Sequence, residues 1–250
     1  MNWTATVSRS SPWSSTDADS FIRHAGAQAC AICISFGDLS IYLQKKRNMP
    51  EESNNMMSGQ TGCSTTPTQV SYDRMALRKK VLDFLEGNGI AYELHEHPEL
   101  STIEECMEYW KDISNATHCK NLFFRNHKGN RHYLVSMECH KNLDIHALEK
   151  SLHQGKLSFA SEERMQRCLG VHPGSVCAFG LINDMNIADA DTKELFENGH
   201  RIKYYIDKDL RSAERISFHP CENTASVVIS VTDFLRFLSL WGGEVEWLDI

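Results

Sequence analysis

The chain has 250 residues, a length that allows one domain with a sizeable core and an irregular appendage. Its apolar fraction of 41% and charged fraction of 24% are those of an ordinary globular protein, and no apolar run approaches the roughly 20 residues of a membrane span. The net charge of −7 argues against bulk attraction to nucleic acid. We therefore expect no membrane or DNA partner, although a local basic patch is allowed.

The nine cysteines are scattered, and their odd number favours reduced thiols over a disulfide framework. The first 23 residues also lack the basic start and apolar stretch of a secretory signal, so a cytoplasmic location is expected. Cys30 and Cys33 have the gap of a zinc pair, but no second pair at comparable spacing accompanies them. We expect neither a metal nor a cofactor.

Residues 1–72 lack the periodicity of a folded domain. Their last third, 48–71, is rich in Pro, Gly, Ser, Thr and Asn, and cannot bury enough surface to offset its ordering entropy. The basic triplet 45–47 is typical of a solvated charge run. The sequence predicts a largely disordered extension and linker over 1–72 and a folded domain over 73–250.

Regular structure is predicted from Asp73 onward, beginning with a helix that Asp73 caps and that ends at Gly87. After a strand at 91–95, Ser101 and Glu104 predict a capping box for a helix to about residue 111. Two strands joined by a hairpin turn at 127–130 follow and should form the centre of the sheet. Their predicted ranges are 117–126 and 131–138.

The second half of the domain continues this alternation. Asp144, Ser161 and Thr232 predict the starts of three further helices, of which the second ends at Gly170 and the last at Gly242. The further predicted strands are 157–160, 176–182, 202–206, 215–218 and 226–230. The pattern favours an α/β fold with a mixed, largely antiparallel sheet and flanking helices, rather than a doubly wound parallel sheet.

The stretch Cys119–Arg125 is the first candidate for chemistry. Lys120 and Asn121 stand at the mouth of an apolar run that predicts a buried strand. A nucleophile elbow and the glycine patterns of nucleotide-binding loops are absent from the sequence. A lysine in this position is more often a solvated strand end than a catalytic group, so the remaining motifs decide its interpretation.

Three other polar clusters stand at predicted turns. His95 and His97 would share one face of a strand and could begin a metal site, but surface histidines explain them more simply. The glycines of 170–176 allow close backbone approach to a ligand, and 219–223 forms a polar turn with Asn183 as a polar companion from another strand end. Each cluster alone is weak evidence.

The order of these motifs resembles a known family. His97-Pro98, Thr102-x-Glu104-Glu105, Lys120-Asn121-Leu122-Phe123, Leu169-Gly170 with Pro173-Gly174-Ser175-Val176, Gly180-Leu181-Ile182-Asn183-Asp184 and His219-Pro220-x-x-Asn223 stand as in the YbaK-type aminoacyl-tRNA deacylases. The chain is most similar to their ProX (PrdX) branch, called prolyl-tRNA synthetase associated domain proteins in animals. The resemblance covers about residues 75–242 and implies a mixed sheet curled into a partial barrel with surrounding helices.

This resemblance implies hydrolysis in trans of an amino acid wrongly esterified to tRNA, in this branch alanine on a proline tRNA. Lys120 matches the functionally critical lysine. Gly174, Ser175 and Val176 match the loop around the aminoacyl group, whereas His219 and Asn223 match the motif that bounds the small amino-acid pocket. Asn183, in the matching motif 180–184, is a further candidate for substrate binding. Ala178 stands where the family loop commonly has proline, which leaves the choice among alanine, serine and cysteine open.

The expected partners are the acceptor stem and 3′ end of tRNA and an aminoacyl-tRNA synthetase. Arg125, Lys128 and Arg131 lie near the central hairpin and are candidates for stem phosphates, although ordinary solvated surface explains them equally well. Two other functions remain open. One is a non-catalytic tRNA-binding or synthetase-associated module with this fold, and the other is a metal-dependent hydrolase that uses His95 and His97 and is sensitive to chelation.

Overall fold

The computed structural model describes residues 73–100, 102–185, 187 and 191–250. The predicted disordered extension over 1–72, with its cysteine pair and basic triplet, lies outside the described residues. Within the described ranges, no helix is both long and apolar enough to cross a membrane.

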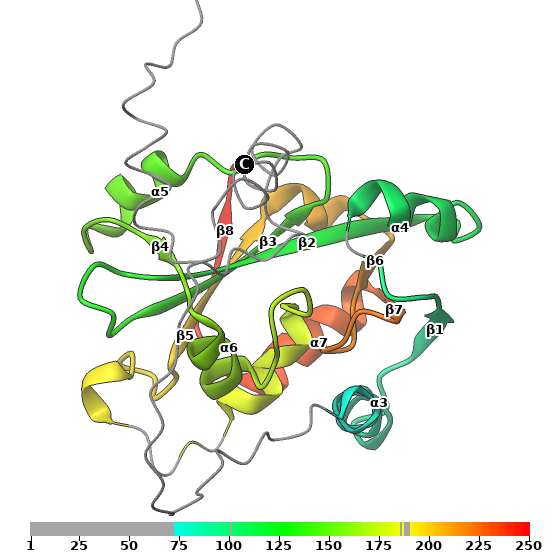
Figure 1. The fold of residues 1–250 in the computed structure, drawn as a ribbon, viewed down its shortest axis with the longest axis horizontal. Helices are drawn as coiled ribbons and strands as arrows, with labels where there is room; N and C mark the ends of the chain where they lie inside the picture. The colour runs from blue at the N-terminus through cyan, green and yellow to red at the C-terminus, as the bar shows by residue number, and fades with distance from the viewer. Residues whose placement is uncertain (1–72, 101, 186, 188–190) are drawn as a thin grey trace, which may run out of the picture.

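A mixed sheet organises the domain, in the strand order β1-β7-β6-β2-β3-β5-β8, with β4 paired to the free edge of β2 (Figure 1). Antiparallel pairs join β1 to β7, β7 to β6, and β2 to β3 and β4; parallel pairs join β2 to β6, β3 to β5 and β5 to β8. The strands are β1 (Tyr92–Glu96), β2 (Ala116–Arg125), β3 (His132–Glu138), β4 (Ser158–Phe159), β5 (Ile202–Asp207), β6 (Arg215–Phe218), β7 (Ala225–Ser230) and β8 (Val245–Leu248). This confirms the mixed α/β sheet and places the predicted hairpin, β2 and β3, at its centre.

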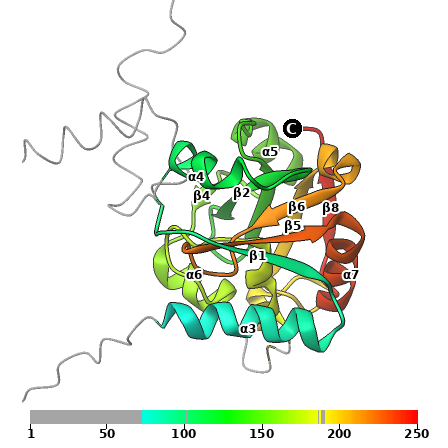
Figure 2. The same ribbon diagram turned by 90° about the vertical axis from the view of Figure 1, so that its right-hand side faces the viewer.

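Helices cover both faces of this sheet. The helices are α3 (Arg74–Gly87), α4 (Ile103–Trp110), α5 (Ile145–Leu152), α6 (Glu162–Leu169) and α7 (Val231–Trp241), with the 3-10 helices η2 (Ala178–Asp184), η3 (Thr192–Glu194) and η4 (Lys208–Ser212). In Figure 1, α6 and α7 lie below β2 and β3, and in Figure 2 α3 lies below the strands whereas α4 and α5 lie above them. The two faces of the central hairpin therefore belong to two separate cores.

Strand alternation divides β2 between these cores. Phe123 belongs to the larger core, with side chains from α3, α6, η2 and α7, whereas Leu122 and Phe124 belong to a smaller core with Leu148 of α5. Every one of these strand residues is at most 6% exposed. Burial on both faces explains why β2 is a continuous apolar run rather than an alternating one, and it fixes the strand's register.

Most helix caps follow the sequence prediction, with corrections of one or two residues. Asp73 and Asp144 accept backbone N–H bonds as N-caps, and Gly170 and Gly242 end their helices in left-handed conformations. The capping box of α4 is made by Thr102 and Glu105, one residue beyond the predicted pair Ser101 and Glu104. The cap of α7 is Ser230 rather than Thr232, since the Ser230 hydroxyl accepts the N–H of Asp233.

One predicted strand is wrong, and one strand was not predicted. Most of the run 176–182 forms the 3-10 helix η2 (Ala178–Asp184) instead of a strand, because Gly180 packs against Leu169 of α6 so closely that an added Cβ would lie 3.1 Å from the backbone oxygen of Leu169. The alternation-poor segment after Gly242 forms β8, which pairs in parallel with β5. The pattern of an apolar run as short as 176–182 does not distinguish a buried strand from a short helix.

Candidate active site

The centre of the candidate site is a gap along one edge of β2. β3 pairs with the other edge over Cys119–Arg125, so β6 and β4 share the remaining edge. β6 pairs there only up to His118, and β4 joins only at Phe124. The intervening stretch, which contains Lys120, is therefore where the neighbouring strands diverge.

Strand alternation places Lys120 and His219 on the same face at this gap. His118 pairs with Ser217 of the parallel strand β6, and side chains two residues apart on a strand share a face. Lys120 therefore projects with His118, and His219, one residue beyond the end of β6, leaves the sheet on that same face. The Lys120 side chain is half-buried. Burial and Glu138 raise the pKa of the Cys139 thiol to about 12, and the nearby charge of Lys120 opposes this rise.

Asn121 projects to the opposite face and is part of the fold. Its side-chain oxygen accepts a hydrogen bond from the Ser136 hydroxyl, which accepts one in turn from the Tyr204 hydroxyl at 2.7 Å. All three side chains are at most 8% exposed. This buried chain links β2, β3 and β5, and it fixes the strand segment that presents Lys120.

The structure brings the predicted loop and the predicted turn together. Gly174 has a φ of +90°, and a Cβ at this position would lie 3.8 Å from the Asn223 amide nitrogen. Next to it, the buried sulfur atoms of Cys177 and Cys221 are 3.6 Å apart. Two segments that are 44 residues apart in sequence thus form one wall.

The remaining loop residues and Asn183 differ in their surroundings. Ser175 is buried and donates its backbone N–H to the carbonyl of His172 at 3.0 Å, and Val176 packs against the larger core. Asn183 lies at the end of η2, where its amide donates to the carbonyl of Leu169 at 2.7 Å and its oxygen accepts from Lys80. Its amide is thus used to hold η2 against α6.

A histidine cluster borders the gap on the side of α4. The rings of Trp110 and His118 are stacked, with their centroids 4.1 Å apart. Nε1 of Trp110 donates to the Ser226 hydroxyl, and the same hydroxyl contacts Nε2 of His97 at 3.2 Å. The His97 ring lies 5.7 Å from that of His219. Residues from α4, β2 and β7, and the residues that follow β1 and β6, therefore converge at this point.

Burial keeps two of these histidines neutral. The pKa of His219 is lowered to about 4, first by burial and then by His97 and His118. Burial likewise lowers the pKa of His118 to about 4. The buried Nε2 of His219 has no hydrogen-bond partner among the residues that the structure describes. At neutral pH this side of the gap presents uncharged imidazoles.

The turn that carries His219 is held by an ion pair that sequence reasoning missed. Glu222 is fully buried, and its carboxylate accepts from Nε of Arg78 on α3 at 2.9 Å and from the backbone N–H of Thr224 at 2.7 Å. Arg78 also donates to the Thr224 hydroxyl at 2.7 Å. No spacing rule connects residues that are 144 positions apart, but a glutamate inside the His-Pro-x-x-Asn motif was an available signal.

Asn223 contributes a second tie from the same turn. Its amide donates to Glu99 at 3.3 Å, and Glu99 accepts from Arg74 at 2.6 Å, which lowers the pKa of the Glu99 carboxyl. The motif residues after the histidine therefore connect the turn to α3 and to the segment after β1. The side chains of Glu222 and Asn223 thus hold the turn in place, and their contacts are structural rather than catalytic.

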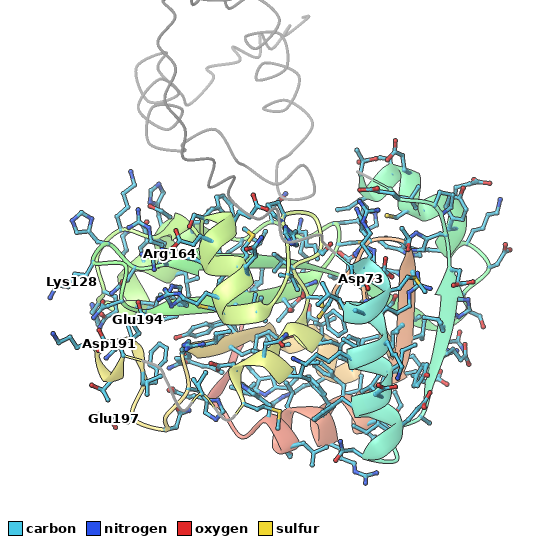
Figure 3. All side chains as sticks on the ribbon, turned by 60° about the horizontal axis from the view of Figure 1, so that its bottom comes forward. Asp73, Lys128, Arg164, Asp191, Glu194 and Glu197 are labelled. Carbon is cyan, nitrogen blue, oxygen red and sulfur yellow. The ribbon has the colours of Figure 1, made fainter. Side chains whose placement is uncertain are left out.

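The three predicted RNA contacts lie at the other end of β2. Arg125 is five residues beyond Lys120, or about 16 Å along an extended strand. Lys128 is exposed at the hairpin tip, and Figure 3 shows it at the end of the molecule remote from Asp73. Arg131 is half-buried and donates to the carbonyl of Lys193 at 2.5 Å. These cations are thus separated from the gap.

The histidine pair 95 and 97 does not form a metal site with its neighbours. His95 contacts Glu93 at 3.4 Å, whereas His97 contacts the carbonyl of Pro98 and the Ser226 hydroxyl. Across the described ranges, the three potential ligands that come within 4.8 Å of one another are Glu138, Cys139 and His140, and neither candidate histidine belongs to this group.

A cavity of about 590 Å³ lies elsewhere, on the face of the smaller core. Arg131 is the one candidate residue among its lining side chains, which include Tyr133, Phe196, Lys203 and Tyr205. Lys203 is already paired with Glu246 at 2.9 Å. The cavity is therefore distinct from the gap that carries Lys120.

The chain is similar to known proteins over most of the described domain. The model of the aminoacyl-tRNA editing domain family matches residues 97–237. The prolyl-tRNA editing protein ProX of Acetoanaerobium sticklandii is 33% identical over 177 residues, which cover 70% of this chain and 99% of that protein. The mouse (Mus musculus) prolyl-tRNA synthetase associated domain-containing protein 1 is 32% identical over 175 residues, 67% of this chain and 93% of that protein.

A solved structure described as a trans-editing enzyme for prolyl-tRNA synthetase has a TM-score of 0.47 with this chain at 20% identity. The match covers 69% of this chain and 97% of the solved one.

Proposed function

The chain belongs to the aminoacyl-tRNA editing domain family, and from that premise we propose that it hydrolyses the ester bond of a misacylated tRNA in trans. The observation that supports the proposal is the register of β2 and β6, from which we infer that Lys120 and His219 share one face of the β2 gap. The proposed substrate is alanyl-tRNA(Pro), and the products are free alanine and tRNA.

In this proposal Lys120 supplies the positive charge. Its ammonium anchors the phosphate of the 3′ adenosine or stabilises the negative charge that develops on the ester carbonyl oxygen. A water molecule, helped by the neighbouring ribose 2′ hydroxyl, attacks the ester, so no protein nucleophile is needed. The half-buried position of Lys120 strengthens its electrostatic effect relative to an exposed lysine.

The loop and the turn form the proposed aminoacyl pocket. Gly174, Ser175 and Val176 supply backbone groups near the carbonyl, and His219 and Asn223 bound the side-chain space, with Asn183 bracing η2 behind the loop. A neutral His219 suits an apolar methyl group better than a charged imidazolium does. Selectivity by size is useful here, because a synthetase pocket built for proline cannot strongly exclude the smaller alanine.

The tRNA would be held through its acceptor stem. Arg125, Lys128 and Arg131 are the proposed phosphate contacts, and the unpaired 3′ end would reach from them to Lys120. An aminoacyl-tRNA synthetase that supplies the misacylated tRNA is the proposed protein partner. We place the reaction in the cytosol, since six described cysteines are free thiols.

Release of alanine from alanyl-tRNA(Pro) tests the proposal. The wild-type protein should deacylate this substrate much faster than Lys120→Ala, because loss of one oxyanion-stabilising group costs about 10²–10³ in rate. Lys79→Ala is the matched control, since Lys79 is an exposed lysine paired with Asp83 on α3. Wild-type turnover no greater than that of Lys120→Ala would refute the proposal, and tRNA binding without turnover would favour a non-catalytic module.

A further inference from the structure

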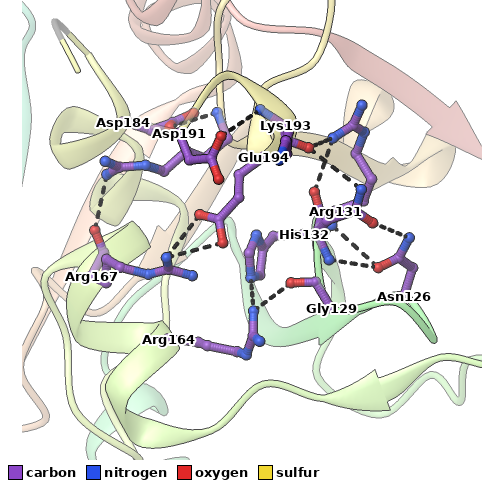
Figure 4. Close-up of polar contacts among 12 residues, drawn as sticks. Asn126, Gly129, Arg131, His132, Arg164, Arg167, Asp184, Asp191, Lys193 and Glu194 are labelled. Atoms are coloured by element: carbon purple, nitrogen blue, oxygen red, sulfur yellow. Dashed lines mark hydrogen bonds and ion pairs between the residues drawn. The ribbon is translucent and has the colours of Figure 1, made fainter. Parts of the chain in front are cut away.

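Five arginines lie at the hairpin end of the sheet, and the charges of four of them act on one buried histidine. They come from β2 and the hairpin, from α6 and from the residue before β5, and they are Arg125, Arg131, Arg164, Arg167 and Arg201. Figure 4 shows His132 and Glu194 between Arg131, Arg164 and Arg167. We call this group the arginine cluster. Such a concentration is unusual in a chain whose net charge is −7.

Backbone carbonyl groups hold these guanidinium groups in place. Arg164 donates to the carbonyl of Gly129 at 2.7 Å, Arg131 to that of Lys193 at 2.5 Å, and Arg201 to that of Arg167 at 3.2 Å (Figure 4). A carbonyl orients a guanidinium group without cancelling its charge. Each group has five N–H donors, so further donors remain after these bonds are made.

Carboxylates neutralise only part of the cluster. Glu194 pairs with Arg167 at 2.8 Å. Asp184 is buried and accepts the backbone N–H groups of Arg201 and Ile202, and burial raises its pKa to about 6. Asp191 accepts the N–H of Lys193 and lies on the surface. The arginines therefore exceed the carboxylates that contact them, with Lys193 adding a further positive charge.

The positive charge of the cluster affects the pKa of its buried histidine. His132 is fully buried, and its Nε2 accepts a hydrogen bond from Arg164 at 2.9 Å. Its pKa is lowered to about 3, first by burial and then by the charges of four arginines of the cluster. The positive charge of the site therefore comes from the arginines and not from a proton on this imidazole.

We propose that the arginine cluster binds the phosphodiester backbone of RNA, with Arg164, Arg167 and Arg201 as its core. Planar guanidinium groups fixed in position match the geometry of phosphate oxygens, and prior orientation reduces the entropy lost on binding. The proposal rests on the proposed function, because a deacylase must hold a tRNA while its 3′ end is cleaved. It extends the RNA-binding surface from the hairpin onto α6 and β5.

The position of α6 relates this surface to the gap. Arg164 and Arg167 lie on α6, which ends at Gly170, and the chain then enters the loop that contains Gly174. A phosphate held by α6 is thus connected to the proposed aminoacyl pocket by a short, continuous stretch of chain. The cluster should affect substrate binding more than the chemical step.

Binding of uncharged tRNA to the full chain tests the proposal without any need for turnover. Arg167→Gln should weaken binding several-fold, and Arg164→Gln combined with Arg167→Gln should weaken it about tenfold or more at moderate salt. The slope of log K against log salt should decrease by about 0.7–0.9 for each phosphate that the variant no longer neutralises. In deacylation, KM should rise while kcat changes little.

Arg236→Gln on α7 is the matched control, because Arg236 also donates to a backbone carbonyl, that of Gly89, but lies outside the cluster. If Arg164→Gln proves unstable, Arg167→Gln decides, since the Arg167 side chain is 41% exposed. Unchanged tRNA affinity and salt slope for Arg167→Gln and Arg201→Gln would overturn the proposal, as would equal losses in Arg236→Gln. Because this binding assay needs no turnover, a wild-type protein that binds tRNA through Arg167 but releases no alanine would refute the proposed function alone, so the two failures are distinguishable.

Discussion

Removing Arg78 should destabilise the domain far more than removing a neighbouring arginine. Arg78→Ala leaves the Glu222 carboxylate fully buried with only its bonds to Thr224, and an uncompensated buried charge costs about 3–5 kcal/mol. The remaining bonds from Thr224 place the expected loss near the lower end of that range, about 3 kcal/mol. The partner Glu96 adds little, because its side chain is 72% exposed.

The loss should be measured by urea unfolding followed by circular dichroism. A loss of about 3 kcal/mol lowers the midpoint at an unchanged m value, and it lowers Tm by about 6–12 °C for a domain of this size. Arg74→Ala is the matched control on the same helix. Arg74 pairs with Glu99 at the surface, so its removal should cost no more than about 1 kcal/mol.

A double substitution separates the buried charge from a loss of packing. Arg78→Met with Glu222→Leu removes both charges and should regain most of the stability lost in Arg78→Ala. A loss in Arg78→Ala no larger than in Arg74→Ala, or a double variant as unstable as the single one, would refute the reasoning. Since Glu222 belongs to the turn of His219, Arg78→Ala should also reduce deacylation.

Two further predictions concern the loop and the pH dependence of stability. Gly174→Ala should lower kcat/KM, because the residue has a φ of +90° and lies beside Asn223 in the proposed pocket. Gly199→Ala is the control: its φ is +82° with open space around it, so it should strain the backbone by a similar ~1 kcal/mol and leave activity unchanged. Equal activity in the two variants would contradict this prediction. The unfolding free energy should fall as pH drops from about 6.5 toward 4, because the lowered pKa values of His118 and His132 make the unfolded chain bind more protons there. Asp184, with its raised pKa, opposes this slope, and denaturant titrations of His118→Phe should show a shallower dependence than wild type.

The sequence predicted most of the fold because its local signals agreed with its packing. Asp73, Asp144 and Gly170 have the capping roles expected of them, and the hairpin of β2 and β3 forms the centre of the sheet. The error at η2 arose from an apolar run whose shape was decided by contact with Leu169 of α6. Tertiary contact of this kind leaves no periodic trace in a short segment.

The candidate site was predicted less completely than the fold. The ordered motifs identified the segments, and Gly174 and Asn223 do lie side by side. The sequence did not reveal that Glu222 is buried against α3, nor that α6 and β5 bring arginines to one place. Both depend on side chains that are distant in sequence, and each appears in the sequence as an ordinary charged residue.

The ion pair of Arg78 and Glu222 also constrains how the domain is made during translation. The two residues are 144 positions apart, and β1 beside α3 pairs with β7 near the end of the chain. α3 and β1 leave the ribosome early, but their partners in the sheet emerge only after most of the domain has been synthesised. Contacts between residues far apart in sequence form slowly, so β1 stays unpaired until β7 has been synthesised. Its open edge is exposed to chaperones during that time.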